Sequence, residues 1–191
     1  MKQLNKRQEA ILLSLKKLDY LNRDQLSKIH RLGKKRNTNR ILNDLSQYLS
    51  HFREEYTTIY YLNKEGREYV NSQKVRRKTS FVQHVIMRND FYIYSGFPKD
   101  WKNEIKIMDD KNSVICDALF SKNGKNYCLE VDSKQQMKEN RAKIKRYLSL
   151  YNGANNFPTV IWLTTTENRR KQLVELCKDM PCVVYSIDDI R

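Results

Sequence analysis

Hydrophobic residues in the first third of the chain recur at helical spacing and then alternate as in strands. Three helices are predicted there, then a pair of short strands and one more short helix, over residues 6–18, 24–32, 37–49, 52–62 and 64–70. Asn37 or Thr38 is expected to cap the third helix. Because this order of elements is that of a winged helix-turn-helix, we expect such a domain over residues 1–72.

The remainder of the chain predicts an α/β sheet covered by helices. Residues 71–80 are polar and basic without periodicity and are expected to be a linker. A helix is predicted over 79–95, and Asn123-Gly124 between two apolar runs predicts a β-hairpin. The pattern then alternates between helices and strands, over residues 138–151, 158–164, 167–178 and 181–187. The predicted second domain spans 79–191, and the whole chain is expected to be α+β.

Positive charge is concentrated toward the N-terminus. The 191-residue chain has a formal net charge of +15. Residues 1–78 contain 19 Lys and Arg against 8 Asp and Glu, whereas residues 79–191 contain 18 against 14. A basic surface that only aids solubility is one interpretation. The excess, together with the predicted motif, favours a polyanionic partner, and we expect this to be double-stranded DNA.

The apolar segments and the cysteines indicate where the protein acts. No apolar run approaches the length of a membrane span, and Met1–Arg7 leads into an amphipathic stretch rather than a signal-peptide core. The four cysteines form no CxxC pair and lie among apolar residues, which favours reduced core thiols. We therefore expect a cytoplasmic protein with no membrane partner.

The predicted third helix carries the candidate DNA contacts. Its polar face offers side chains able to bond base edges or phosphates, a basic turn precedes it, and an arginine lies at the expected tip of the wing. The candidates are Lys34, Lys35, Arg36, Asn37, Asn39, Arg40, Asn43, Gln47 and Arg53. A three-helix structural domain with a solvated basic face is the alternative.

The hairpin register predicts a pair of facing carboxylates. A loop symmetric about Asn123-Gly124 pairs residues whose numbers sum to 247, which places Asp117 opposite Glu130. Asp132 shares their face, since it lies two residues beyond Glu130. Such a cluster needs a compensating cation, either Mg²⁺ in a nuclease site or a side chain such as that of Lys143. The pattern leaves the functional and structural interpretations open. It also places Cys116 and Phe120 on one face of the strand.

Several short motifs resemble the replication-relaxation family, whose members are encoded largely by mobile elements of Gram-positive bacteria. They are Lys6-Arg7-Gln8-x-x-Ile11-Leu12, Tyr60-Tyr61-Leu62-x-x-x-Gly66, Asp117-Ala-Leu-Phe, Cys-Leu-Glu130-Val-Asp132, Lys143-x-x-x-Tyr147, Asn-Phe157-Pro158-x-Val-Ile-Trp162 and Arg169-Arg170. The resemblance implies a winged helix joined to a restriction-endonuclease-like, PD-(D/E)xK-like domain. It would place metal-binding acids at Asp117 and Glu130 and a lysine at position 132, where this chain has an aspartate. Lys143 or Lys134 would then have to substitute for that lysine.

Three functions remain in competition. We favour a DNA-binding protein of a plasmid, phage or integrative element, acting without catalysis in replication, relaxation, transfer or their control, as a homodimer or within a replication or relaxase complex. The second is a Mg²⁺-dependent nuclease or nickase, with Asp117, Glu130, Asp132 and Lys143 as catalytic residues and metal at the first two. The third is a winged-helix transcription regulator with a dimerisation domain. No cofactor is expected unless the nuclease-like site is active, in which case it needs Mg²⁺.

Overall fold

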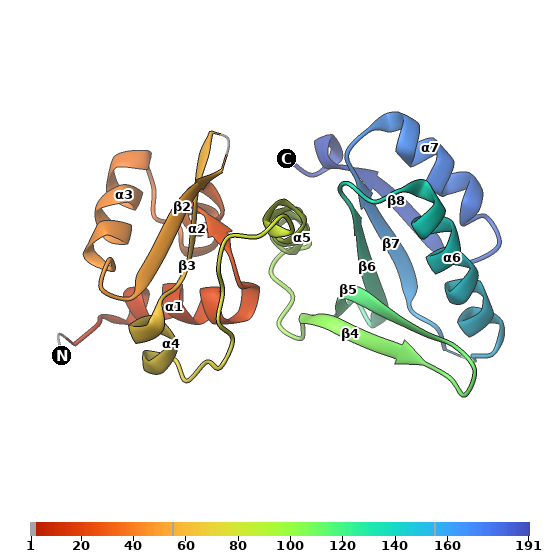
Figure 1. Cartoon of the computed structure of the whole chain (residues 1–191), viewed down its shortest axis with the longest axis horizontal. Coiled ribbons are helices and arrows are strands. Elements are labelled where there is room, and N and C mark those ends of the chain that lie inside the picture. The colour runs from red at the N-terminus through yellow and green to blue at the C-terminus, as the bar shows by residue number, and fades with distance from the viewer. Residues whose placement is uncertain (1–2, 55, 155) are drawn as a thin grey trace. The chain divides into compact units, whose positions relative to one another are not determined.

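The computed structural model describes residues 3–54, 56–154 and 156–191. The chain divides into two compact units, Met1–Asn89 and Asp90–Arg191, and is an α+β protein (Figure 1). The boundary falls inside helix α5 (Val82–Tyr94), beyond the segment predicted as a linker.

The first unit has the predicted order of elements. Three helices and a short strand precede a β-hairpin and a final short helix: α1 (Lys6–Leu18), β1 (Leu21–Asn22), α2 (Arg23–His30), α3 (Lys35–Asp44), β2 (Leu49–Glu54), β3 (Thr57–Leu62) and α4 (Lys64–Tyr69). The three strands form an antiparallel sheet in the order β1-β3-β2. Its core consists of the apolar positions that recur along the helices, such as Ile11, Leu15 and Leu26, together with Ile59 of β3.

Helix α3 is shorter than predicted at its C-terminal end. It ends at Asp44, and two turns follow, in which Leu45 N–H donates to the carbonyl of Leu42 and Tyr48 N–H to that of Leu45. The carbonyls of Gln47 and Tyr48 then accept hydrogen bonds from Asn63, which follows β3. The expectation that Gln47 lies on the polar face of this helix is therefore wrong. Hydrogen bonding to a residue 16 positions away redirects the chain into β2.

The segment predicted as a linker packs along the first unit. Tyr20 Oη donates a hydrogen bond of 2.7 Å to the carbonyl of Arg77, and Arg76 donates to the buried carboxylate of Asp19 at 2.6 Å. Within α5, Asn89 Nδ2 donates to the carbonyls of Leu18 and Tyr20. These polar contacts explain why the first compact unit extends to residue 89.

The second unit is a five-stranded mixed sheet in the order β4-β5-β6-β7-β8. Its elements are β4 (Lys102–Met108), β5 (Ser113–Lys122), β6 (Lys125–Asp132), α6 (Met137–Asn152), β7 (Thr159–Thr164), α7 (Glu167–Leu176), β8 (Cys182–Ser186) and the 3-10 turn Ile187–Asp189. The first three strands are antiparallel and the last three parallel. Helices α6 and α7 cover one face of the sheet, packing around the buried Trp162 (Figure 1).

The predicted hairpin register is confirmed from Lys122–Lys125, at the Asn-Gly turn, to Ala118–Leu129. This pairing ends one residue short of Asp117 and Glu130, and Asp117 instead accepts a hydrogen bond from the backbone N–H of Val131. The expectation that Cys116 and Phe120 share a face is wrong, because Cys116 joins the cluster beneath α6 whereas Phe120 stacks on Trp101. Regular alternation is interrupted near Asp117, opposite which Glu104 of β4 has a φ of 55°.

Candidate functional site

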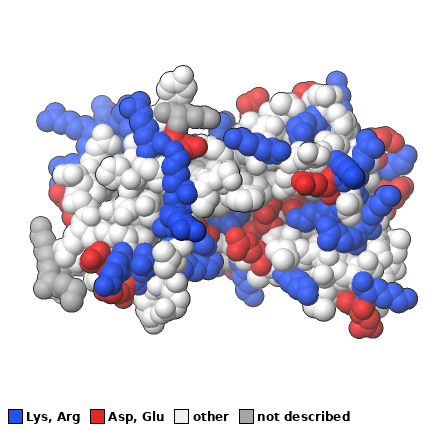
Figure 2. Space-filling view, in the orientation of Figure 1, with Lys and Arg blue, Asp and Glu red and all other residues white. Residues whose placement is uncertain are grey.

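One face of α3 is exposed and rich in basic and amide side chains. The buried side chains Thr38, Ile41 and Leu42 hold the opposite face against the unit. Helical spacing therefore turns the remaining positions outward. The exposed predicted contacts are Lys34, Lys35, Arg36, Asn39, Arg40 and Asn43, and Gln47 is exposed in the turn that follows the helix. Figure 2 shows Lys and Arg side chains gathered over this helix and the β2–β3 hairpin.

Asn37 has a role that the sequence did not predict. It is half-buried, and its Nδ2 donates a 2.7 Å hydrogen bond to the carbonyl of Leu32, while its Oδ1 accepts one from Arg40. It does not cap the helix, because Lys34 occupies the N-cap position. Asn37 therefore secures the turn between α2 and α3. Arg40 also lies 3.5 Å from Asp44, a surface pair of little energetic weight that leaves its guanidinium available.

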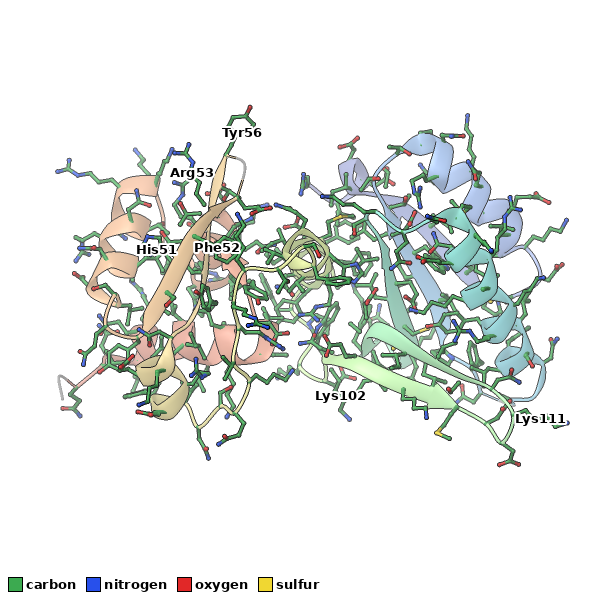
Figure 3. All side chains as sticks on the ribbon, viewed as in Figure 1. His51, Phe52, Arg53, Tyr56, Lys102 and Lys111 are labelled. Carbon is green, nitrogen blue, oxygen red and sulfur yellow. The ribbon has the colours of Figure 1, made fainter. Side chains whose placement is uncertain are left out.

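The β2–β3 hairpin presents an exposed arginine and an exposed tyrosine. Arg53 is exposed on β2, close to the turn of the hairpin. Tyr56 is 97% exposed at the tip, and Figure 3 shows it pointing away from the unit. An aromatic side chain that contacts so little of its own protein is available to a partner. Sequence reasoning missed Tyr56, although its position in the turn between two strands was the available signal.

A groove lies between α3 and the hairpin. Asn39 and Asn43 of α3 face it from one side, and His51 of β2 and Tyr60 of β3 face it from the other. The rings of His51 and Tyr60 lie 5.8 Å apart, and burial raises the pKa of Tyr60. The groove thus lies between the two elements, α3 and the hairpin, for which the sequence separately predicted DNA contacts. His51 and Tyr60 were missed because they reach it only through strand pairing.

Glu130 of β6 lies buried beneath α6 with both carboxylate oxygens engaged. Lys143 Nζ donates to Oε2 at 2.6 Å, and Tyr147 Oη donates a short hydrogen bond to Oε1. Burial raises the pKa of Glu130 to about 8, and the negative charge of Asp117 adds to the shift, although Lys143 and Tyr147 oppose it. Lys143 thus acts as the compensating cation considered for this cluster.

Asp132 is buried within a complete set of hydrogen bonds. Arg169 donates to both of its oxygens at 2.6 Å, and Asn140 and Thr164 each donate one more bond of 2.8 Å. Burial opposes ionisation, but these hydrogen bonds outweigh it and leave the pKa of Asp132 lowered. Asp132, where the family resemblance implied a lysine, is therefore the centre of an ion pair between β6 and α7.

Asp117 is the most accessible of the three acids. It is partly buried, and its Oδ2 accepts a 2.7 Å hydrogen bond from the backbone N–H of Val131. The structure therefore brings Asp117, Glu130 and Lys143 into one neighbourhood but directs Asp132 toward Arg169. Within residues 3–54, 56–154 and 156–191, no three His, Cys, Asp or Glu side chains are grouped so as to hold a metal ion. No local signal in the sequence indicated the roles of Arg169 and Tyr147, because their contacts with Asp132 and Glu130 depend on how α6 and α7 pack on the sheet.

Among the residues that the structure describes, no helix combines the length and apolar character needed to span a membrane. All four cysteines are free thiols, with three of them buried. The fold and the polar contacts thus define an α+β protein with a basic helical unit and a sheet unit whose buried acids are paired.

Comparison with models of protein families identifies the family of the chain. The replication-relaxation family model matches residues 12–160, which is most of the sequence. The chain belongs to the replication-relaxation family. The match includes α3 and the hairpin in the first unit, and Asp117, Glu130, Asp132 and Lys143 in the second. No curated protein sequence matches the chain.

Two solved structures resemble the chain with low sequence identity and low TM-scores. Protein VC1899 from Vibrio cholerae is 13% identical, with a TM-score of 0.40, and the match covers 96% of this chain and 47% of that one. Can2 from Sulfobacillus thermosulfidooxidans, solved in complex with cyclic tetra-adenylate, is 12% identical, with a TM-score of 0.37 and coverages of 95% and 53%. The chain therefore spans about half the length of these structures, and neither likeness carries an argument about its function.

Proposed function

We propose that this chain is a double-stranded-DNA-binding protein of a mobile element, and that its first unit is a winged helix with α3 as the recognition helix. The observation that carries the proposal is the exposed face of α3, where Lys34, Lys35, Arg36 and Arg40 accompany Asn39 and Asn43. Asparagine side chains can bond base edges in the major groove, and the basic side chains suit phosphates. Membership of the replication-relaxation family supports an action in replication or DNA relaxation.

The hairpin is the second contact of the proposed interface. In a winged helix, the ribbon after the recognition helix reaches the backbone or an adjacent groove. Arg53 supplies charge for such a contact, and the exposed ring of Tyr56 supplies an apolar surface that can pack on a sugar of the backbone. The groove between α3 and the hairpin joins the two contacts through His51 and Tyr60.

Removing two charges from α3 should weaken DNA binding about tenfold. The variant is K35A/R40A in the full chain, and both side chains are exposed, so the fold should persist. Log K falls linearly as log salt rises, and each lost phosphate contact makes this dependence shallower by about 0.9. We therefore expect the steepness of the slope to decrease by about 2. The affinity for a labelled duplex is measured by fluorescence anisotropy over a series of salt concentrations.

A variant with the same loss of charge elsewhere serves as the control. K6A/K64A changes exposed lysines of α1 and α4, outside α3 and the hairpin. We expect less than about a twofold change from it, because surface charges without phosphate contacts act only at long range. Equal weakening in both variants would contradict the proposed recognition helix.

The biological role is tested by the position of the bound site. Footprinting on the DNA of the element should show protection at an origin of replication or transfer. Protection confined to a promoter would instead favour the transcription regulator, with the second unit serving for dimerisation.

The second candidate function is a metal-dependent nuclease, favoured by the proximity of Asp117, Glu130 and Lys143. Against it, Lys143 and Tyr147 already occupy both oxygens of Glu130. We expect no nicking of supercoiled plasmid with Mg²⁺ or Mn²⁺, measured by agarose electrophoresis. Nicking that disappears in Glu130→Ala would establish the nuclease and overturn the proposal of a non-catalytic protein.

A further inference from the structure

The positive charge of the second unit is concentrated on one helix. Helix α6 contains five Lys and Arg against the single acidic residue Glu139. The rest of residues 90–191 contains 12 Lys and Arg against 13 Asp and Glu. The rest of the second unit is thus nearly neutral, and the excess positive charge of the unit lies on α6. Figure 2 shows basic side chains over this helix.

Four of the five basic side chains are exposed on the outer side of α6. Asn140, Ile144 and Tyr147 are buried and fix the inward face. Lys138, Arg141 and Lys145 are three and four positions apart, so they form one stripe, with Arg146 beside it. At 1.5 Å per residue, the stripe is about 10 Å long. Lys143 faces inward to Glu130 and is not part of this basic stripe.

Among the described residues, the stripe has no acidic partner. No hydrogen bond or ion pair involves Lys138, Arg141, Lys145 or Arg146 within the described part of the chain. On α7, by contrast, Arg170 pairs with Glu167 at 3.3 Å and Lys178 with Glu175 at 2.9 Å. Over the described ranges of the chain, the positive charge of the stripe is therefore not offset by a paired acid, and an external anion can offset it.

We infer that the outer face of α6 is a second DNA-contacting surface, which binds the phosphate backbone without reading bases. The inference rests on the proposed DNA-binding function and adds a contact outside the winged helix. Lys and Arg side chains spaced along a helix suit a polyanion with regularly spaced charges. Amide side chains, which could discriminate bases, are absent from the stripe itself.

The composition of this face disfavours the other anionic partners. A helix that binds a membrane surface inserts large apolar side chains, but the apolar side chains of α6 are packed in the core of its own unit. A stable protein interface needs an apolar centre, and none of the large hydrophobic residues found exposed in the described chain lies on α6. A phosphate backbone needs neither feature.

The test compares two triple variants of the full chain. K138A/R141A/K145A removes the stripe, and K102A/K106A/K125A removes three exposed lysines of β4 and β6 (Lys102 is labelled in Figure 3). Anisotropy with a labelled duplex should show about a tenfold loss of affinity at moderate salt for the stripe variant. For the same variant, the slope of log K against log salt should become shallower by about 2 to 3. The control should change by less than about twofold, and circular dichroism checks that both variants are folded.

The α3 variant K35A/R40A, measured alongside, separates the two claims. If it weakens binding while the stripe variant does not, the inference about α6 is overturned and the proposed function stands. If only the stripe variant weakens binding, the inference stands and the recognition helix is misplaced. Equal losses in the stripe and control variants overturn the inference. A wild-type protein that binds vesicles of anionic lipid but no duplex overturns both.

Discussion

Arg169→Ala should lower the free energy of unfolding of the second unit by about 3–5 kcal/mol. The variant leaves the fully buried carboxylate of Asp132 without the guanidinium that donates to both of its oxygens. Breaking a buried ion pair by removing one partner is costly, because the remaining charge stays desolvated and uncompensated. Asn140 and Thr164 each still donate one hydrogen bond, which keeps the cost below that of an isolated buried charge.

The neighbouring arginine is a matched control. Arg170 forms only surface pairs, with Glu167 at 3.3 Å and Asp189 at 3.7 Å, so Arg170→Ala should cost less than about 1 kcal/mol. Both tryptophans of the chain, Trp101 and Trp162, are buried in the second unit, so their fluorescence during urea unfolding reports this unit alone. Similar unfolding midpoints for the two variants would contradict a structural role of the Asp132–Arg169 pair.

Gly66→Ala should destabilise the first unit by about 2–3 kcal/mol. A Cβ atom at this position in α4 would lie 2.1 Å from the backbone carbonyl oxygen of Tyr48. Alanine ordinarily favours a helix over glycine by about 1 kcal/mol, but a clash with backbone has no side chain that can move aside. The strand–helix connection must shift, and with it the chain that leads from α3 into the hairpin.

Gly153→Ala provides the comparison for this prediction. A Cβ at Gly153 would find its nearest neighbour at 3.7 Å, which is ordinary contact, so stability should change by less than about 1 kcal/mol. Far-UV circular dichroism during urea unfolding follows both units. The first unit contains no tryptophan, so its unfolding appears in the circular-dichroism signal and not in the tryptophan fluorescence. Gly66→Ala should lower the urea midpoint of that transition and leave the midpoint of the fluorescence transition unchanged. An unchanged transition would show that the contact between α4 and Tyr48 is not required.

Local patterns predicted most of the elements. The helical spacing of Ile11 and Leu15 and the Asn123-Gly124 turn act over few residues, so the helices and the hairpin register followed from the sequence. The end of α3, the path of residues 71–80 and the face of Cys116 were predicted wrongly or incompletely. Each depends on a contact with a distant part of the chain, as when Asn63 binds the carbonyl of Gln47.

The candidate site also combines features that follow from local sequence patterns with features that depend on distant contacts. The exposed face of α3 followed from its apolar stripe, because burial of one side of a helix exposes the other. The hairpin register followed from the sequence up to the Ala118–Leu129 pair, one residue short of the predicted pairing of Asp117 with Glu130. The separation of Asp132 from these two acids did not, because its partner Arg169 lies 37 positions further along the chain.

The sequence by itself determined where the positive charge is concentrated, which residues form the hairpin and which helix face is polar, since these properties depend on composition and near neighbours. Only the tertiary structure decided which charges are neutralised. Packing of α6 and α7 on the sheet brings Lys143 to Glu130 and Arg169 to Asp132, and leaves Lys138, Arg141 and Lys145 exposed. Pairing depends on distances of a few ångströms between residues far apart in sequence, and those distances exist only once the core has formed.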